Sequence, residues 1–229
     1  MAVGSLIDRP NSKRTTITIS RQMGSGGSYI GQVIASRLGI KYVDREVLHF
    51  AAKEFGCDEE TIAARSERLS SFWERILKGL TLGIPESRYV PPPIRSFSDE
   101  ELFEKQTEIL KRIATKDDCV VIGWAGVHIL AQHQGMFSMF CHAPTAFRIK
   151  RVMQIYDIAS PEEARARIEE SDEKRKRYFQ VMTEHEWSCA ADYHLAIDTS
   201  LLPLDQIAEM VINIVKNQRK GEQGKRGTG

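Results

Sequence analysis

The chain has 229 residues, enough for one large α/β domain or for a domain with an inserted lid. Hydrophobic residues make up 41% of it and charged residues 28%, and the formal net charge is +1. This balance excludes a general electrostatic attraction to nucleic acid or to a membrane surface, so any anion site must be local.

The cysteines and the N-terminal residues indicate the cellular compartment of the protein. The four cysteines lie far apart without a CxxC pair, so their spacing predicts neither a zinc site nor a disulfide framework. The first residues lack the apolar core of a signal peptide, and no apolar run is long enough to span a bilayer. We therefore expect a cytoplasmic protein.

Residues 15–38 predict a strand, a glycine-rich turn and a helix in that order. Residues 15–20 are mostly β-branched, and a helical period of apolar residues runs from about Ser28 to Gly39. Such a layout gathers several backbone N–H groups and a helix N-terminus around one anion. Before it, residues 1–14 are polar, and we expect them to be flexible.

The remaining elements alternate between helical and strand patterns. This alternation predicts an α/β fold with a parallel sheet of about five strands, covered on both faces. A highly charged helix is predicted at 160–183, with Ser160 as its N-cap and Pro161 at its first position. Further strands are predicted at 40–43, 119–122, 136–141 and 193–197, a proline-rich loop at 83–98, and a disordered tail at 218–229.

The glycine-rich turn matches the phosphate-loop pattern GxxxxGK[ST] only in part. Gly26 takes the second glycine position, but Arg21 stands at the first glycine and Gly27 where the lysine belongs. Ser28 takes the position of the Mg²⁺ ligand. Arg21 is the nearest cation that could replace the lysine. The alternative interpretation is a flexible turn without a ligand.

Five blocks of sequence follow one another over about residues 14–216: ISRQMGSGGSYIG, YVDREVL, CVVIGWAGVHIL, RIKRVM, and DEKRKRY with the later YHLAIDTS. In this order the blocks resemble the cytidylate kinase-like family of P-loop proteins. The resemblance implies a P-loop NTPase-like three-layer α/β/α fold forming a single domain over 15–217. It also implies a helical insertion at about 58–98, a lid at about 155–183, ATP and Mg²⁺ as cofactors, and CMP or dCMP as acceptor.

Position and resemblance together give the candidate binding residues. Asp44 and Arg45 end the second strand, at the edge where α/β sheets bind ligands, and the resemblance places them near the acceptor. Capping the next helix is an equally good role for Asp44. Trp124 stands where the family has arginine, and it can stack on a base but cannot bind phosphate. The backbone of Gly24, Ser25, Gly26, Gly27 and Ser28 would bind the ATP phosphates, with Ser28 also reaching the metal ion.

The resemblance implies that the charged helix is a lid whose arginines close over the transferred phosphoryl group. The catalytic candidates are Arg21, Arg151, Asp172 and Arg175, with Arg148 one turn before Arg151. The alternative is a solvated helix face with i,i+4 ion pairs. His128 and His133 do not share a helical face, so no metal pair is expected from them.

Two functions follow. The first is ATP-dependent phosphoryl transfer to a nucleoside monophosphate, which requires positioning and charge stabilisation more than acid–base chemistry. The second is a P-loop protein that binds nucleotide or phosphate with weak or no catalysis. Three features favour the second function: Gly27 in place of lysine, Trp124 in place of arginine, and the lack of a clear Walker B acid, the carboxylate that would hold Mg²⁺. The expected partner is a small nucleotide, with neither nucleic acid nor membrane, and the sequence does not indicate an oligomeric state.

Overall fold

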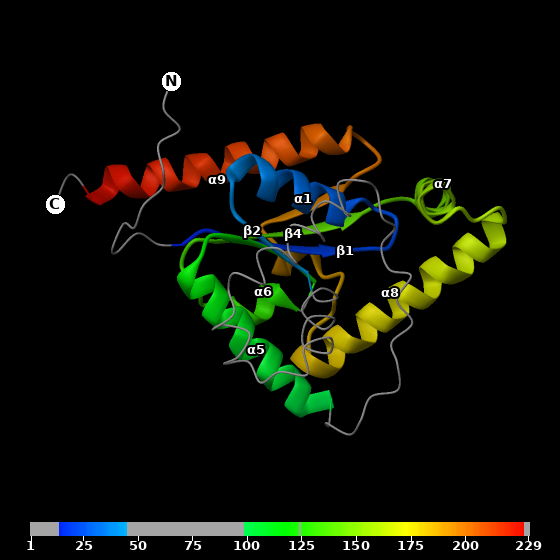
Figure 1. Cartoon of the computed structure of the whole chain (residues 1–229), viewed down its shortest axis with the longest axis horizontal. Helices are drawn as coiled ribbons and strands as arrows, with labels where there is room; N and C mark the ends of the chain where they lie inside the picture. Colours follow the sequence, from blue (N-terminus) through cyan, green and yellow to red (C-terminus); the bar gives the residue numbers. More distant parts are fainter. Residues whose placement is uncertain (1–13, 45–98, 124, 227–229) are drawn as a thin grey trace, which may run out of the picture.

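The structure, a computed structural model, describes residues 14–44, 99–123 and 125–226. The predicted helical insertion at 58–98 lies outside these residues, as do Arg45 and Trp124. Most of the rest forms a sheet flanked by helices (Figure 1).

The described sheet has five parallel strands in the order β2-β3-β1-β4-β5. All six residues of the central strand β1 are buried. This explains its β-branched composition, because a strand covered on both faces needs no polar side. The prediction of a parallel sheet of about five strands is confirmed. The strands are β1 (Thr16–Arg21), β2 (Lys41–Asp44), β3 (Cys119–Ile122), β4 (Met136–His142) and β5 (Leu195–Asp198).

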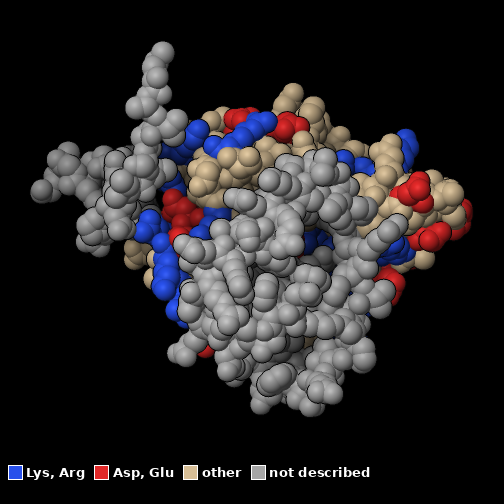
Figure 2. Space-filling model, viewed as in Figure 1, with Lys and Arg blue, Asp and Glu red and all other residues tan. Residues whose placement is uncertain are grey.

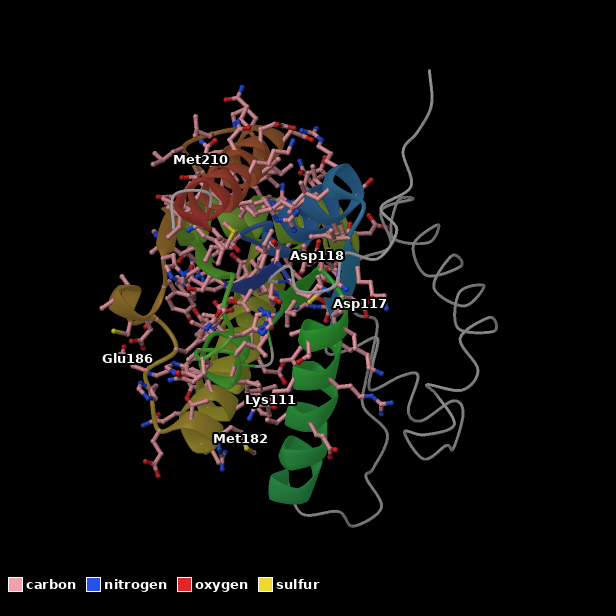
Figure 3. The ribbon with its side chains drawn as sticks, turned by 90° about the vertical axis from the view of Figure 1, so that its left-hand side faces the viewer. Lys111, Asp117, Asp118, Met182, Glu186 and Met210 are labelled. Carbon is pink, nitrogen blue, oxygen red and sulfur yellow. The ribbon has the colours of Figure 1, made fainter. Side chains whose placement is uncertain are left out.

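Helices cover both faces of the sheet, which confirms the predicted three-layer α/β/α fold (Figure 1). One face packs against Ile34 of α1 and Ile207 of α9, and the other against Leu110 of α5. Met210 on α9 and Lys111 on α5 lie on opposite sides of the sheet (Figure 3). The helices are α1 (Gly27–Leu38), α5 (Asp99–Lys116), α6 (Gly126–Ile129), α7 (Thr145–Tyr156), α8 (Pro161–Thr183) and α9 (Leu204–Arg226), with a 3₁₀ turn, η1 (Ala190–Asp192).

The last helix is longer than the sequence predicted. α9 continues to Arg226, so the expected disordered tail at 218–229 is helical over most of its length. Arg219 supplies a physical reason, because its guanidinium donates hydrogen bonds to Thr15 and Asp118 at the N-terminal edge of the sheet. This contact fastens the end of the helix to the first strand.

The predicted start of the charged helix is confirmed. The Ser160 hydroxyl accepts a hydrogen bond from the Glu163 N–H, and Pro161 begins α8. The N-terminal half of α8 packs on α7 and on the loop after β1 through an apolar cluster. Met182 marks the C-terminal end of α8, and Glu186 lies beyond this end (Figure 3). The buried residues of the cluster are Met23, Ile149, Val152, Ile158, Ala164 and Ile168.

Charges of both signs lie next to one another over α1 and α9 on the face shown in Figure 2. Arg37 of α1, for example, forms ion pairs with Asp205 and Glu209 of α9. None of the helices in the described part of the chain is both long and apolar enough to cross a bilayer.

Candidate phosphate-binding site

The loop between β1 and α1 lies at the C-terminal edge of the sheet, and two of its glycines are structurally required. Gly24 and Gly26 have φ angles of 78° and 88°, in the left-handed region that favours glycine. Gly24 also has no room for a side chain, because a Cβ there would lie 2.9 Å from the Arg148 carbonyl oxygen. Tight packing from α7 therefore fixes the shape of the loop.

The carbonyl oxygens of four consecutive loop residues all accept hydrogen bonds. Two of the donors are arginine side chains from α7, and one is a hydroxyl that follows β5. The N–H groups of Gly24, Gly26 and Gly27, by contrast, have no acceptor within the described part of the chain. The bonds are Ser25 N–H to Gln22 (3.2 Å), Arg148 Nη1 to Met23 (3.3 Å), Arg151 Nε to Gly24 (3.2 Å) and Thr199 Oγ1 to Ser25 (2.6 Å).

This division of the backbone suits an anion. The loop's carbonyl oxygens accept hydrogen bonds from cationic and hydroxyl donors. Their partial negative charge is therefore offset and does not repel a bound anion. The open N–H groups and the N-terminus of α1 supply partial positive charge at one place. A phosphate group fits this set of donors.

Arg21 connects three parts of the site. Its side chain is 8% exposed, Nε donates to the Ser28 hydroxyl over 3.2 Å, and Nη2 lies 3.7 Å from Oδ2 of Asp44. The guanidinium also passes over Gly123 at the end of β3, where a Cβ would lie 2.6 Å from Nη1. Three residues proposed from sequence, namely Arg21, Ser28 and Asp44, are thus in contact.

The space that a lysine side chain would need at position 27 is occupied by Arg21. A Cβ on Gly27 would lie 2.6 Å from the Cβ of Arg21 and 3.2 Å from that of Cys141. A lysine at position 27 would therefore collide with the stem of Arg21. The two departures from the phosphate-loop pattern are sterically linked, because the arginine fills the space beside the glycine.

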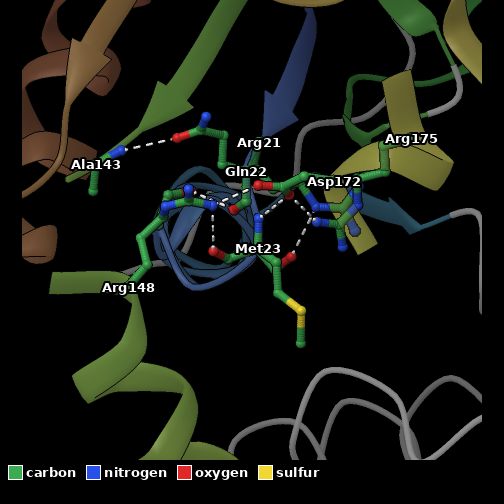
Figure 4. A network of polar contacts seen from close by, with 9 residues as sticks. Arg21, Gln22, Met23, Ala143, Arg148, Asp172 and Arg175 are labelled. Atoms are coloured by element: carbon green, nitrogen blue, oxygen red, sulfur yellow. Dashed lines mark hydrogen bonds and ion pairs between the residues drawn. The ribbon is translucent and has the colours of Figure 1, made fainter. Parts of the chain in front are cut away.

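Helix α8, the predicted lid, reaches the loop through Asp172 (Figure 4). Its carboxylate accepts hydrogen bonds from the Met23 N–H over 2.8 Å, from Arg148 over 2.5 Å and from Arg175 over 3.5 Å. The sequence-predicted pair Asp172 and Arg175 is therefore brought next to the loop. Arg151 is there too, through its bond to the Gly24 carbonyl.

Two more residues belong to the site: Arg148, which the sequence grouped with Arg151, and Thr199, which was not among the candidates from sequence. Arg148 is buried, and it joins Met23 to Asp172. Its place beside Ile149 and Val152 on the buried side of α7 was a signal, because an arginine in an apolar stripe needs a buried acceptor. Thr199 had no comparable signal, since its bond to the Ser25 carbonyl spans 174 residues.

Ser28 does not fit a magnesium ion in this arrangement. Its hydroxyl oxygen, predicted to bind the metal, accepts a hydrogen bond from the positively charged Arg21. A divalent cation at that oxygen would lie against the guanidinium and be repelled. The site therefore fits phosphate oxygens, while Mg²⁺ binding by Ser28 stays a prediction that this contact opposes.

The nearby thiols are chemically quiet. Burial raises the pKa of Cys141, the β4 partner of Arg21, to about 12, although the arginine charge opposes the shift. Burial likewise raises the pKa of Cys119 to about 11. Neither thiol is a nucleophile at neutral pH, because the thiolate is the reactive form. The chemistry of the site therefore rests on its hydrogen-bond donors and arginines.

Comparison with known proteins agrees with this picture of the fold. Residues 16–201 match the profile of the cytidylate kinase-like family. No curated protein gives a significant sequence match. An uncharacterized protein from Eubacterium ventriosum ATCC 27560 superposes with a TM-score of 0.65 at 18% identity, covering 89% of this chain and 99% of its own, and therefore shares the fold.

Two named kinases are more distant. A gluconokinase from Sinorhizobium meliloti 1021 gives a TM-score of 0.49 at 16% identity, covering 94% of this chain and 99% of its own. A shikimate kinase from Acinetobacter baumannii in complex with shikimate gives 0.46 at 13% identity, covering 90% and 94%. At these scores they add nothing to the choice of substrate.

Proposed function

The chain belongs to the cytidylate kinase-like family, and on that premise we propose that it transfers the γ-phosphoryl group of ATP to a nucleoside monophosphate, with CMP or dCMP as the first acceptors to test. The observation that carries the proposal is the loop backbone, in which four carbonyls accept hydrogen bonds and three N–H groups find no acceptor among the described residues. This backbone suits a polyphosphate in a protein whose family name refers to a kinase.

The reaction asks little acid–base chemistry of the protein, because the attacking oxygen already belongs to a phosphate. The N–H groups of Gly24, Gly26 and Gly27 would hold the β-phosphate of ATP. Arg21, fixed between Ser28 and Asp44, would place positive charge where the lysine of other phosphate loops lies. Magnesium, which accompanies ATP in solution, would neutralise further phosphate charge when bound.

The lid would contribute Arg175 and Arg151. Asp172 orients Arg175 at the edge of the loop, and the Gly24 carbonyl orients Arg151. A planar guanidinium can hold two oxygens of a phosphate at once, so either arginine could stabilise the transferred group. Asp44, with Arg45 and Trp124 beyond the described residues, would lie on the acceptor side.

The competing function is nucleotide or phosphate binding without transfer. Gly27 in place of lysine favours it, as does the contact of Ser28 with Arg21 instead of a metal ion. Both functions need the loop's N–H groups to bind phosphate. They differ in whether the arginines act on a second substrate.

A coupled assay of ADP release separates the two. Purified protein is incubated with ATP, Mg²⁺ and one of CMP, dCMP, UMP, AMP or GMP, and nucleotide binding is measured in parallel by calorimetry. Turnover with one acceptor supports the kinase. Binding of ATP without turnover on any acceptor supports the binding protein, and absence of ATP binding removes both.

Matched variants test the lid. Arg175→Ala should lower kcat/KM by roughly 100-fold, the usual cost of removing one stabilising donor from a phosphoryl-transfer site. Arg177→Ala removes an exposed arginine two residues away on the same helix and should leave activity unchanged. Equal losses in the two variants would contradict a specific role for Arg175.

A further inference from the structure

Three potential metal ligands converge at the C-terminal end of the lid helix, away from the phosphate loop. His128 comes from α6, His185 follows α8, and Asp192 ends η1. One ligand atom from each lies within 4.8 Å of the others. From the sequence alone, His128 was paired with His133 as a possible metal site and rejected. The fold instead brings His128 next to two potential ligands more than fifty positions further along the chain.

The separations within this cluster do not suit hydrogen bonds. Oδ2 of Asp192 lies 3.7 Å from Nε2 of His128 and 3.8 Å from Nδ1 of His185. Nε2 of His128 is buried and has no hydrogen-bond partner within the described part of the chain. An unpartnered buried ring nitrogen beside a carboxylate is a costly arrangement unless something lies between them.

The charge state of the two rings points the same way. The imidazoles of His128 and His185 stack with centroids 4.0 Å apart, so two protonated rings would repel each other. A neutral imidazole is the form that ligates a metal.

We propose that His128, His185 and Asp192 bind one divalent transition-metal ion of the zinc class. Two imidazole nitrogens and one carboxylate oxygen are the donors that Zn²⁺ accepts, at about 2.0–2.2 Å each. Two such bonds can span the observed 3.7 and 3.8 Å at an open angle. Three protein ligands leave a fourth position for water. Nitrogen donors of this kind do not suit Mg²⁺ or Ca²⁺.

The ion would fasten the end of the lid helix to the body of the protein. His128 packs edge-on against Phe179 of α8, with ring centroids 5.0 Å apart, and Trp187 and Tyr193 complete the same apolar cluster. Because Asp172 and Arg175 stand on the same helix, a bound ion would restrict the lid from its far end. The inference is independent of the proposed phosphoryl transfer.

The test uses full-length untagged protein, stripped of metal with a chelator and titrated separately with Zn²⁺ by calorimetry and with Co²⁺ by visible absorption. We expect one equivalent of Zn²⁺ and a Co²⁺ d–d spectrum typical of low coordination number. His185→Asn and Asp192→Asn should each weaken Zn²⁺ binding at least tenfold. His133→Asn, which removes a histidine outside the cluster, should not.

Thermal unfolding gives a second readout that does not depend on activity. Zn²⁺ should raise Tm of the unaltered protein but not of His185→Asn. The side chain of His185 is half-exposed, so its replacement leaves the buried core unchanged. The inference fails if stripped protein takes up no Zn²⁺ at equimolar micromolar concentration. It also fails if His185→Asn binds Zn²⁺ as tightly as the unaltered protein.

Discussion

A β-carbon on Gly27 would lie 2.6 Å from the β-carbon of Arg21, so the glycine is required by the arginine beside it. The nearest atom belongs to the stem of Arg21 and cannot rotate away. Gly27→Ala should therefore lower the free energy of unfolding by about 1–3 kcal/mol through overpacking. It should also abolish ATP binding, since the loop must shift; urea denaturation and calorimetry measure the two effects.

Gly39→Ala is the matched control. Gly39 ends the same helix with φ 64°, and a Cβ there meets nothing within 4 Å. Its substitution should cost roughly 1 kcal/mol of left-handed strain and leave ATP binding intact. Loss of binding in both variants would show that general destabilisation, and not the contact with Arg21, is responsible.

Exchange of the two side chains should be reciprocal. Arg21→Gly removes the proposed phosphate charge, and Gly27→Lys forces a lysine against Arg21, so each single variant should lose at least about 100-fold in ATP affinity or kcat/KM. The double variant has the residues of the common GxxxxGK pattern at both positions. It should recover at least about tenfold over either single variant, a coupling that double-mutant analysis measures directly.

Asp172→Asn should loosen α8 from the phosphate loop. The substitution leaves buried Arg148 without its counter-charge, and it weakens the acceptor for the Met23 N–H. Removal of one partner from a largely buried ion pair costs about 3 kcal/mol. Urea denaturation should show this loss, and limited proteolysis should cut near α8 sooner.

Glu173→Gln removes a neighbouring carboxylate from the exposed side of the same helix. We expect a change in the free energy of unfolding within about 0.5 kcal/mol. If Asp172→Asn behaves in the same way, Asp172 does not hold the loop.

The thiols should differ sharply in reactivity. With pKa values raised to about 11 and about 12 by burial, Cys119 and Cys141 should resist iodoacetamide at pH 8. Of the three cysteines within the described residues, the partly exposed Cys189 should be labelled first, as peptide mapping would show. In denaturant all three should react alike, and early labelling of Cys141 in the folded protein would contradict the burial.

The same shifts predict a loss of stability in alkali. Near pH 7, well below the ordinary thiol pKa of 9.0, these thiols are protonated in both states and do not change the free energy of unfolding. As the pH rises from about 9, the unfolded chain releases the protons that the folded protein retains, so unfolding becomes easier. The free energy of unfolding should therefore fall progressively up to about pH 12. Denaturation curves at a series of pH values measure it.

Local chemistry explains why much of the fold was predictable. The apolar run Cys119–Ile122 forms β3 with the predicted bounds, because burial on both faces leaves a continuous hydrophobic signal. Ser160 and Gly39 fix helix ends through contacts within four residues. Such signals are contained in the segment that they shape.

Contacts between distant segments explain the rest. The α9 extension is fastened by Arg219 bonding to Thr15, 204 residues away, and nothing in the polar sequence of the tail indicates that partner. The roles of Arg148 and Thr199 depend likewise on the loop they meet in space. A phosphate loop could be predicted from its glycines, but the donors that hold its carbonyls could not.

The central place of β1 has a consequence for how the protein is made. Both neighbours of β1 in the sheet come much later in the chain, and Thr16 pairs with Cys119 across 103 residues. On the ribosome, the first strand must wait unpaired while more than a hundred residues are translated. The last donor of the loop, Thr199, is added still later. The segment synthesised first is thus among the last to acquire its native contacts, and nascent chains that stop before residue 199 lack a complete phosphate loop.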